Sequence, residues 1–157
     1  MPKILKYYKH FIPVKVRFSD LDVVGHLNNA KYQTFLEEAR IAYFHDVLRQ
    51  DKSSFNFNVV ISKISIDFLK PIEFGDDIIV YTRIFNINTR SHEVHQLFVR
   101  KEKEKIEIVA TAQTSMASFD YHAKIPTTFP SAYCELVKSF EETGEIPAPR
   151  NKTLIEC

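Results

Sequence analysis

A short stretch near the N-terminus, residues 16–32, combines carboxylate, imidazole and amide side chains. Asp20 or Asp22 could serve as a general base, and His26 could exchange a proton near neutral pH. Asn28 and Asn29 are favoured residues for beginning a helix, whose unpaired first amides can stabilise an oxyanion. The same residue types are also typical of a turn and a helix cap without chemistry.

Other acidic residues lie close to this stretch. Asp20 and Asp22 are two positions apart, so an extended backbone would place both carboxylates on one face, where their repulsion would favour protonation of one. Glu37 and Glu38 follow within the next helix and could position water or substrate. Glutamates at such positions are more often part of a solvated helix face.

Hydrophobic periodicity predicts one long helix directly after this stretch. Apolar residues recur at three- and four-residue spacing from 29 to about 49, whereas residues 11–18 alternate as in a half-buried strand. Four further strands are predicted at 59–69, 78–88, 93–101 and 106–119, and a short helix at 131–142. Short breaks between the strands favour antiparallel hairpins. We therefore expect an α+β fold with a curled antiparallel sheet of about five strands wrapped around a long central helix.

Length and composition agree with one globular domain over residues 1–157, with a core at about 12–130 and a C-terminal tail at 131–157. The net charge of +1 gives no electrostatic footprint for nucleic acid. No secretory segment or membrane span is recognised, and the two cysteines lack a ligand pattern. We expect a cytoplasmic protein without a membrane partner.

Several chemistries lack their usual sequence signals. The chain has no G-x-S-x-G, no G-x-G-x-x-G and no Walker sequence, which argues against a serine-elbow nucleophile and a phosphate-binding glycine loop. His92 and His95 are three apart on a predicted strand, so their side chains would point to opposite faces. No metal site is predicted.

Residues 17–32, followed by Phe35–Arg40, resemble hotdog-fold thioesterases of the 4-hydroxybenzoyl-CoA and acyl-CoA thioesterase type. Residues 68–76, 89–91, 110–114 and 124–126 resemble later parts of that family, so the resemblance covers roughly 12–130. It implies hydrolysis of an acyl-CoA thioester to free CoA and a carboxylic acid. It also implies that Asp22 is the catalytic carboxylate, that backbone amides near Asn28 and Asn29 hold the carbonyl, and that CoA enters only as part of the substrate, with no cofactor.

The same run is similar to plant-type acyl-ACP thioesterases, which carry an asparagine two residues after the aspartate. Val24 occupies that position here, which leaves His26 as a helper. The family resemblance further implies a homodimer or homotetramer in which CoA crosses a subunit interface, with Arg90 and Lys124 as candidate phosphate-binding residues. An acyl-ACP thioesterase and a non-catalytic acyl-CoA-binding hotdog domain are the alternatives. A hotdog hydratase is a further rival, but its Asp-x-Asn-Pro-x-His motif is absent.

Overall fold

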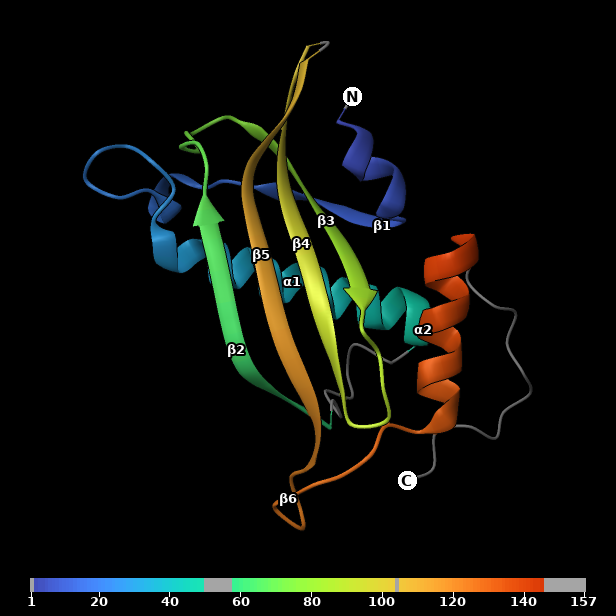
Figure 1. Ribbon diagram of the computed structural model, residues 1–157. Coiled ribbons are helices and arrows are strands. Elements are labelled where there is room, and N and C mark those ends of the chain that lie inside the picture. Colours follow the sequence, from blue (N-terminus) through green and yellow to red (C-terminus); the bar gives the residue numbers. More distant parts are fainter. Residues whose placement is uncertain (1, 50–57, 104, 146–157) are drawn as a thin grey trace.

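The computed structural model describes residues 2–49, 58–103 and 105–145. Its elements, labelled in Figure 1 where there is room, are η1 (Lys3–Tyr7), β1 (His10–Lys15), η2 (Phe18–Asp20), α1 (Asn29–Leu48), β2 (Val59–Phe68), β3 (Asp77–Phe85), β4 (Ser91–Glu102), β5 (Lys105–Asp120), β6 (Ile125–Pro126) and α2 (Ser131–Thr143). The labels η1 and η2 denote short 3-10 helices.

The strands form one antiparallel sheet in the order β1-β3-β4-β5-β2, with the short β6 paired to β5 (Figure 1). Strands β3, β4 and β5 follow one another as hairpins, whereas β2 pairs with β5 at the edge opposite β1. Register shifts interrupt the β2–β5 ladder near Ile61 and the β4–β5 ladder near Phe98. Such bulges bend strands and increase their twist, which helps the sheet to curl.

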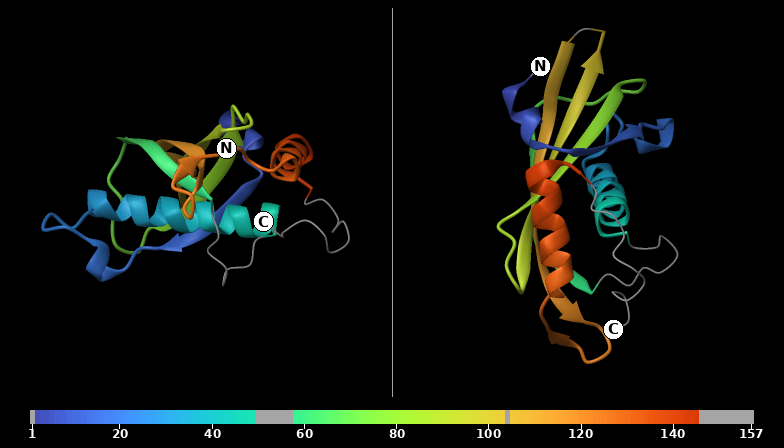
Figure 2. Two further views of the ribbon diagram at one scale, coloured as in Figure 1. Left: turned by 90° about the horizontal axis from the view of Figure 1, so that it is seen from below. Right: turned by 90° about the vertical axis from the view of Figure 1, so that its right-hand side faces the viewer.

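Helix α1 lies along one face of the curled sheet (Figure 2). Its buried residues recur at helical spacing and are Tyr32, Phe35, Leu36, Ala39, Arg40, Tyr43, Phe44, Val47 and Leu48. Leu36 and Phe98 are completely buried in the main core cluster. Ala110 and Ala112 of β5 belong to the same cluster, and their small side chains allow close packing of helix and sheet. The sheet therefore fixes the direction and depth of α1.

A buried polar contact also joins α1 to the sheet. Arg40 is 5% exposed, and its Nη1 donates to Oε1 of Gln96 at 3.2 Å. The Gln96 amide in turn donates to the Leu36 carbonyl at 3.0 Å. Arg40 is thus a structural link between α1 and β4, because its guanidinium is bound within the core.

The C-terminal helix α2 packs against the end of α1 in a second core cluster (Figure 1). Oε1 of Glu141 on α2 accepts hydrogen bonds from the Tyr43 hydroxyl at 2.7 Å and from the Ile84 amide at 2.8 Å. Burial raises the pKa of the Glu141 carboxyl. A third cluster, which includes Leu5, Tyr8 and Leu97, joins η1 to the sheet. The two ends of the described chain are thereby attached to the central sheet.

The predicted α+β hotdog fold is confirmed, including the long helix and the helix after residue 130. The predicted strand at 11–18 was wrong at its end, since β1 stops at Lys15 and η2 follows. Oδ2 of Asp20 accepts a hydrogen bond from the Arg17 amide at 2.9 Å, which closes a tight turn where alternation had suggested a strand. Part of the predicted tail, residues 146–157, lies outside the described residues.

Among the described residues, none of the helices has the length and apolar character needed to span a membrane.

Candidate active site

The loop between η2 and α1 is closed by a bridge of its own and is attached to the rest of the fold near its end. Leu21 and Leu27 form a bridge within the loop, and His26 bridges to Glu73. The Leu27 amide donates to the carbonyl of Ile72 at 2.7 Å. These backbone contacts hold residues 21–28 against the segment that follows β2.

Asp20 has a structural role in this loop. Its side chain caps the turn at Arg17 and lies 3.5 Å from the ammonium group of Lys31. Its carbonyl accepts the amide of Asn28 at 2.9 Å. The expected pairing of Asp20 and Asp22 on one strand face was wrong, because η2 replaces the strand and each carboxylate binds its own partners.

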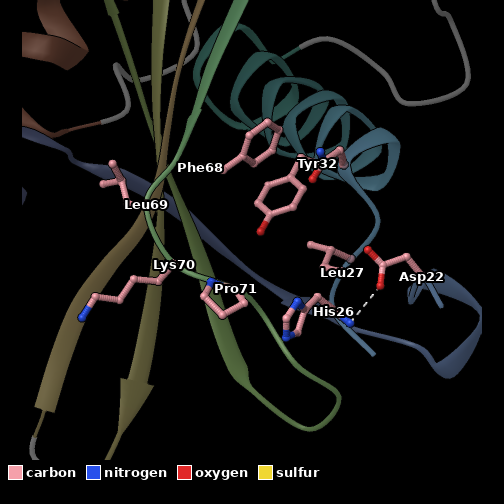
Figure 3. Close-up of a pocket in the computed structure, with 9 residues that line it drawn as sticks. Asp22, His26, Leu27, Tyr32, Phe68, Leu69, Lys70 and Pro71 are labelled. Carbon is pink, nitrogen blue, oxygen red and sulfur yellow. Dashed lines mark hydrogen bonds between the residues drawn. The ribbon is translucent and has the colours of Figure 1, made fainter. Parts of the chain in front are cut away.

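Asp22 presents a free carboxylate oxygen at the pocket. Its Oδ1 accepts hydrogen bonds from the amides of Val24 at 2.9 Å and His26 at 3.2 Å, which fix the carboxylate rotamer. Within the described residues Oδ2 has no partner, and Figure 3 shows it directed away from the His26 amide. Gly25 has a φ of +84° in this turn, a conformation that glycine adopts without steric cost. The turn thus leaves one oxygen free for a water molecule or a carbonyl carbon.

The start of α1 provides one free amide beside this carboxylate. Asn28 is the N-cap, and its Oδ1 accepts from the Ala30 amide at 3.0 Å. The amides of Asn28 and Lys31 are used by the carbonyls of Asp20 and Asn28. Within the described part of the chain the Asn29 amide has no acceptor. Of the two candidate oxyanion donors, only the Asn29 amide is available, because the Asn28 amide already donates to the Asp20 carbonyl.

Asp22 and Asn29 border one pocket of about 220 Å³. Its lining residues are Asp22, His26, Leu27, Asn29, Tyr32, Phe68, Leu69, Lys70 and Pro71 (Figure 3). This lining combines the apolar side chains of Leu27, Phe68, Leu69 and Pro71 with the polar residues Asp22, His26, Asn29 and Lys70. The pocket brings together an acceptor from a loop and a donor from a helix end.

The segment after β2 forms the wall of the pocket opposite Asp22. The Val109 carbonyl accepts the amides of both Leu69 and Lys70 at 3.0 Å. Arg100 donates to the Pro71 carbonyl at 3.1 Å and to Asp76 at 3.0 Å. These bonds hold the wall on β4 and β5, so its position depends on the sheet.

Charged groups next to the wall neutralise one another. Glu107 accepts a hydrogen bond from Lys70 and another from Arg100 at 2.9 Å. These hydrogen bonds lower the pKa of Glu107 to about 2, so it remains an anion at neutral pH. The ammonium group of Lys70, which borders the pocket, is therefore already paired with the Glu107 carboxylate.

His26 contributes its backbone more directly than its ring. Its amide binds Asp22, whereas the ring points toward Pro71 in Figure 3. No hydrogen bond joins the His26 ring to a described residue. Glu37 and Glu38, the other acidic candidates, are exposed on α1 and do not line the pocket.

Sequence reasoning missed Tyr32 as a functional candidate and the residues 68–71 as a pocket wall. From the sequence, Tyr32 was interpreted as a core residue of the helix and as part of the run that resembles the family, although its position one turn after Asn29 places it on the same helix side. Residues 68–71 carried no chemical signal of their own. These residues lie at the site because β2 pairs with β5, with Phe68 opposite Ala110.

Arg90 and Lys124 lie at the other end of the sheet from the pocket. Arg90 precedes β4, whose first residue Ser91 pairs with Ala117, and Lys124 lies in the turn between β5 and β6. Phe68, at the pocket, pairs with Ala110. Seven residues of strand separate the two places on β5, about 24 Å at ~3.4 Å per residue. One chain alone therefore does not bring these cations to the pocket.

His92 and His95 point to opposite sides of the sheet, as predicted. His92 accepts from or donates to the hydroxyl of Tyr133 on α2 at 2.7 Å, whereas His95 contacts the hydroxyl of Tyr8 at 3.1 Å. The described residues contain no group of three or more histidine, cysteine, aspartate or glutamate side chains placed to hold a metal ion.

Comparisons with known proteins point to thioesterases. The model of the Thioesterase-like superfamily matches residues 16–138. The chain is 30% identical over 112 residues to the long-chain acyl-CoA thioesterase FadM of Escherichia coli (strain K12), a match that covers 68% of this chain and 80% of FadM. It is 29% identical over 97 residues to the uncharacterised protein YsmA of Bacillus subtilis (strain 168), covering 62% of this chain and 65% of YsmA.

Solved structures share the overall fold. A thioesterase from Thermus thermophilus, solved in complex with coenzyme A and Zn, superposes with a TM-score of 0.77 and 26% identity, covering 87% of this chain and 97% of that one. A 4-hydroxybenzoyl-CoA thioesterase mutant, solved with 4-hydroxybenzoyl-CoA, gives a TM-score of 0.70 at 18% identity, covering 81% of this chain and 96% of that one, and supports the fold alone.

The fold and these matches place the protein in the class of hotdog-fold thioesterases, which are thioester hydrolases. Because the family model covers most of the chain, the protein belongs to the Thioesterase-like superfamily. The resemblance inferred from the sequence is thereby confirmed.

Proposed function

We propose that this protein hydrolyses an acyl-CoA thioester to free CoA and a carboxylic acid. The observation that carries the proposal is the pairing of a free carboxylate oxygen on Asp22 with the free amide of Asn29 at one pocket. Hydrolysis of a thioester needs an acceptor that activates water or attacks the carbonyl carbon, and a donor for the carbonyl oxygen. The two groups supply these functions.

In the general-base route, Asp22 takes a proton from water while the water oxygen bonds to the carbonyl carbon. The carbonyl oxygen becomes an oxyanion that accepts a hydrogen bond from the Asn29 amide. Collapse of this intermediate breaks the carbon–sulfur bond, and the CoA thiolate takes the proton held by Asp22. In the nucleophilic route, Asp22 bonds to the carbonyl carbon and expels the thiolate, and water then hydrolyses the mixed anhydride.

The relatives favour CoA as the carrier. FadM is named as a long-chain acyl-CoA thioesterase, and the Thermus thermophilus structure contains coenzyme A. A phosphopantetheine arm attached to a carrier protein would present the same thioester. Acyl-ACP is therefore the competing substrate class in the test below.

We further propose that a second copy of the chain completes the binding site. The pocket volume of about 220 Å³ is below the roughly 300–1,000 Å³ of small-molecule sites, so it holds only part of an acyl-CoA. Strand β2 is an edge strand and bears the exposed apolar residues Ile61 and Phe68. Exposed edges of this kind favour pairing with another strand.

Antiparallel pairing of two β2 edges would explain the placement of Arg90 and Lys124. In such a homodimer, the start of β2 in one protomer lies beside the end of β2 in its partner. The cations at the far end of one sheet would then approach the pocket of the other protomer. They would be available for the phosphates of CoA, as the family resemblance implies, and two such dimers could associate further into a homotetramer.

The function is tested by thiol release from short-, medium-, long-chain and aromatic acyl-CoAs and from matched acyl-ACPs. We expect catalytic release of CoA from at least one acyl-CoA, with lower kcat/KM for the matched acyl-ACP. Higher kcat/KM for acyl-ACP would reassign the carrier. Stoichiometric binding of acyl-CoA without any thiol release would identify a non-catalytic binding domain and contradict the proposal.

The shared site is tested by mixing two inactive variants. Asp22→Asn subunits retain the distant cations, whereas the double variant Arg90→Glu with Lys124→Glu retains the carboxylate. Heterodimers reconstituted from the two should regain up to half of the wild-type activity per dimer, because one site then has both parts. Failure of the mixture to exceed the sum of the separate variants, with heterodimers verified by mass, would exclude a shared site.

A further inference from the structure

The hydroxyl of Tyr32 reaches the pocket without a protein partner. Tyr32 is 2% exposed and lines the pocket, yet within the described residues its hydroxyl makes no hydrogen bond. In Figure 3 the hydroxyl points away from α1 into the space bordered by Leu27, His26 and Pro71. The Tyr32 hydroxyl is not one of the buried polar atoms that lack a partner, so it is accessible from the open pocket. It is therefore available to a molecule bound there.

Aromatic packing fixes the direction of this hydroxyl. The Tyr32 ring centroid lies 4.8 Å from that of Phe68 in an edge-to-face contact and 5.0 Å from that of Phe98. Phe98 is completely buried, so it cannot move aside easily. Tyr32 is thus held by the sheet on one side and the pocket wall on the other.

The Tyr32 hydroxyl acts as a donor at neutral pH. Burial raises the pKa of Tyr32 above its usual value, so the phenol keeps its proton. A protonated phenol can donate one hydrogen bond. In the proposed reaction Asp22 binds the water and the Asn29 amide binds the carbonyl oxygen, so the thioester would lie near the Tyr32 hydroxyl. Of the atoms at a thioester, the carbonyl oxygen is the strong acceptor, since thioether-like sulfur accepts only weakly.

We propose that the Tyr32 hydroxyl donates a hydrogen bond to the thioester carbonyl oxygen, as a second oxyanion donor beside the Asn29 amide. This inference rests on the proposed hydrolysis of a thioester. The two donors approach from one helix, Asn29 through its backbone at the first position and Tyr32 through its side chain one turn later. The carbonyl oxygen has two lone pairs and can accept both hydrogen bonds, which strengthen as it becomes negatively charged.

The variant Tyr32→Phe removes the hydroxyl and keeps the ring between Phe68 and Phe98. Loss of one oxyanion donor should lower kcat about 100-fold, with KM changed less than about threefold. The thermal midpoint should stay close to that of the wild type because no protein hydrogen bond is lost.

The matched control is Tyr43→Phe on the same helix. Its hydroxyl donates to Glu141 at 2.7 Å, far from the pocket lining. This variant should have a lower thermal midpoint and an unchanged kcat. The two substitutions remove the same atom and are expected to give opposite results.

Infrared spectroscopy can detect the hydrogen bond from Tyr32 to the carbonyl oxygen in a bound substrate that is not turned over. The best substrate of the acyl-CoA panel, carrying ¹³C at its carbonyl, is bound to Asp22→Asn and to Asp22→Asn with Tyr32→Phe. The carbonyl infrared band should lie at higher frequency in the double variant, because a hydrogen bond to the oxygen has been removed.

The outcomes separate the two proposals. An unchanged kcat in Tyr32→Phe, or an unchanged carbonyl band in the double variant, would overturn the role of Tyr32 while the thioesterase function stands. Absence of turnover in the wild type would overturn the thioesterase function itself. A large loss of kcat with an intact thermal midpoint, together with the band shift, supports the second donor.

Discussion

Burial of His92 should make the stability of this protein depend on pH. His92 is 1% exposed, and its Nε2 lies 2.7 Å from the hydroxyl of Tyr133. Its ring stacks on Phe129 at a centroid distance of 5.2 Å, and its Nδ1 has no partner among the described residues. Burial among these aromatic rings lowers the pKa of His92 from 6.5 to about 4. The folded protein therefore holds a neutral imidazole at a pH where the unfolded chain is protonated.

The sign and size follow from this difference in pKa. A group with a depressed pKa in the folded state contributes stability above its unfolded pKa and loses it as the pH falls toward the folded value. For a change from 6.5 to about 4, the free energy of unfolding should decrease by about 2 kcal/mol between pH 7.5 and pH 5 from this residue alone. The complete loss, below both pKa values, is about 3 kcal/mol.

Urea unfolding at a series of pH values measures this contribution. The variant His92→Gln keeps an acceptor for Tyr133 but cannot titrate, so its stability should vary less between pH 7.5 and pH 5. The exposed His122 gives the control, since His122→Gln should keep the wild-type pH dependence. Equal slopes of stability against pH in the wild type and His92→Gln would refute the reasoning, because the difference isolates His92 from the other titrating groups.

Two further predictions concern the supports of the site. Replacement of the helix cap in Asn28→Ala should reduce the free energy of unfolding by about 1 kcal/mol, whereas Asn28→Asp should keep most of it; equal thermal midpoints for Asn28→Ala and the wild type would argue against the cap. Arg100→Gln loses the ion pairs with Asp76 and Glu107 and the bond to the Pro71 carbonyl, so the pocket wall should loosen and KM should rise at least roughly threefold. Steady-state kinetics decides this, and an unchanged KM would show that the wall does not need Arg100.

The parts of the site that local sequence determines could be predicted. Asp22, Asn28 and Asn29 lie in one turn and one helix start, where side chains bind amides two to four residues away. Turn and cap chemistry of this kind depends on neighbouring residues. The sequence did not show which of the two amides is available. In the structure the Asn28 amide donates to the Asp20 carbonyl, whereas the Asn29 amide has no acceptor among the described residues.

The parts that depend on strand pairing could not be predicted. Residues 68–71 face Asp22 only because β2 pairs with β5, at the edge of the sheet opposite β1. The same pairing sets Arg90 and Lys124 at the far end, a separation that no single segment reveals. The end of β1 was missed because the Asp20 side chain competes with the strand for the Arg17 amide, and such competition overrides simple alternation.

The central claim is that the Asp22 carboxylate performs hydrolysis of the thioester, and Asp22→Asn tests it most directly. An asparagine Oδ1 can still accept from the amides of Val24 and His26, so the turn should persist while the base or nucleophile is lost. With the thermal midpoint unchanged, kcat for release of CoA from the best acyl-CoA substrate should fall at least about 100-fold. Turnover at the wild-type rate in folded Asp22→Asn would contradict the account.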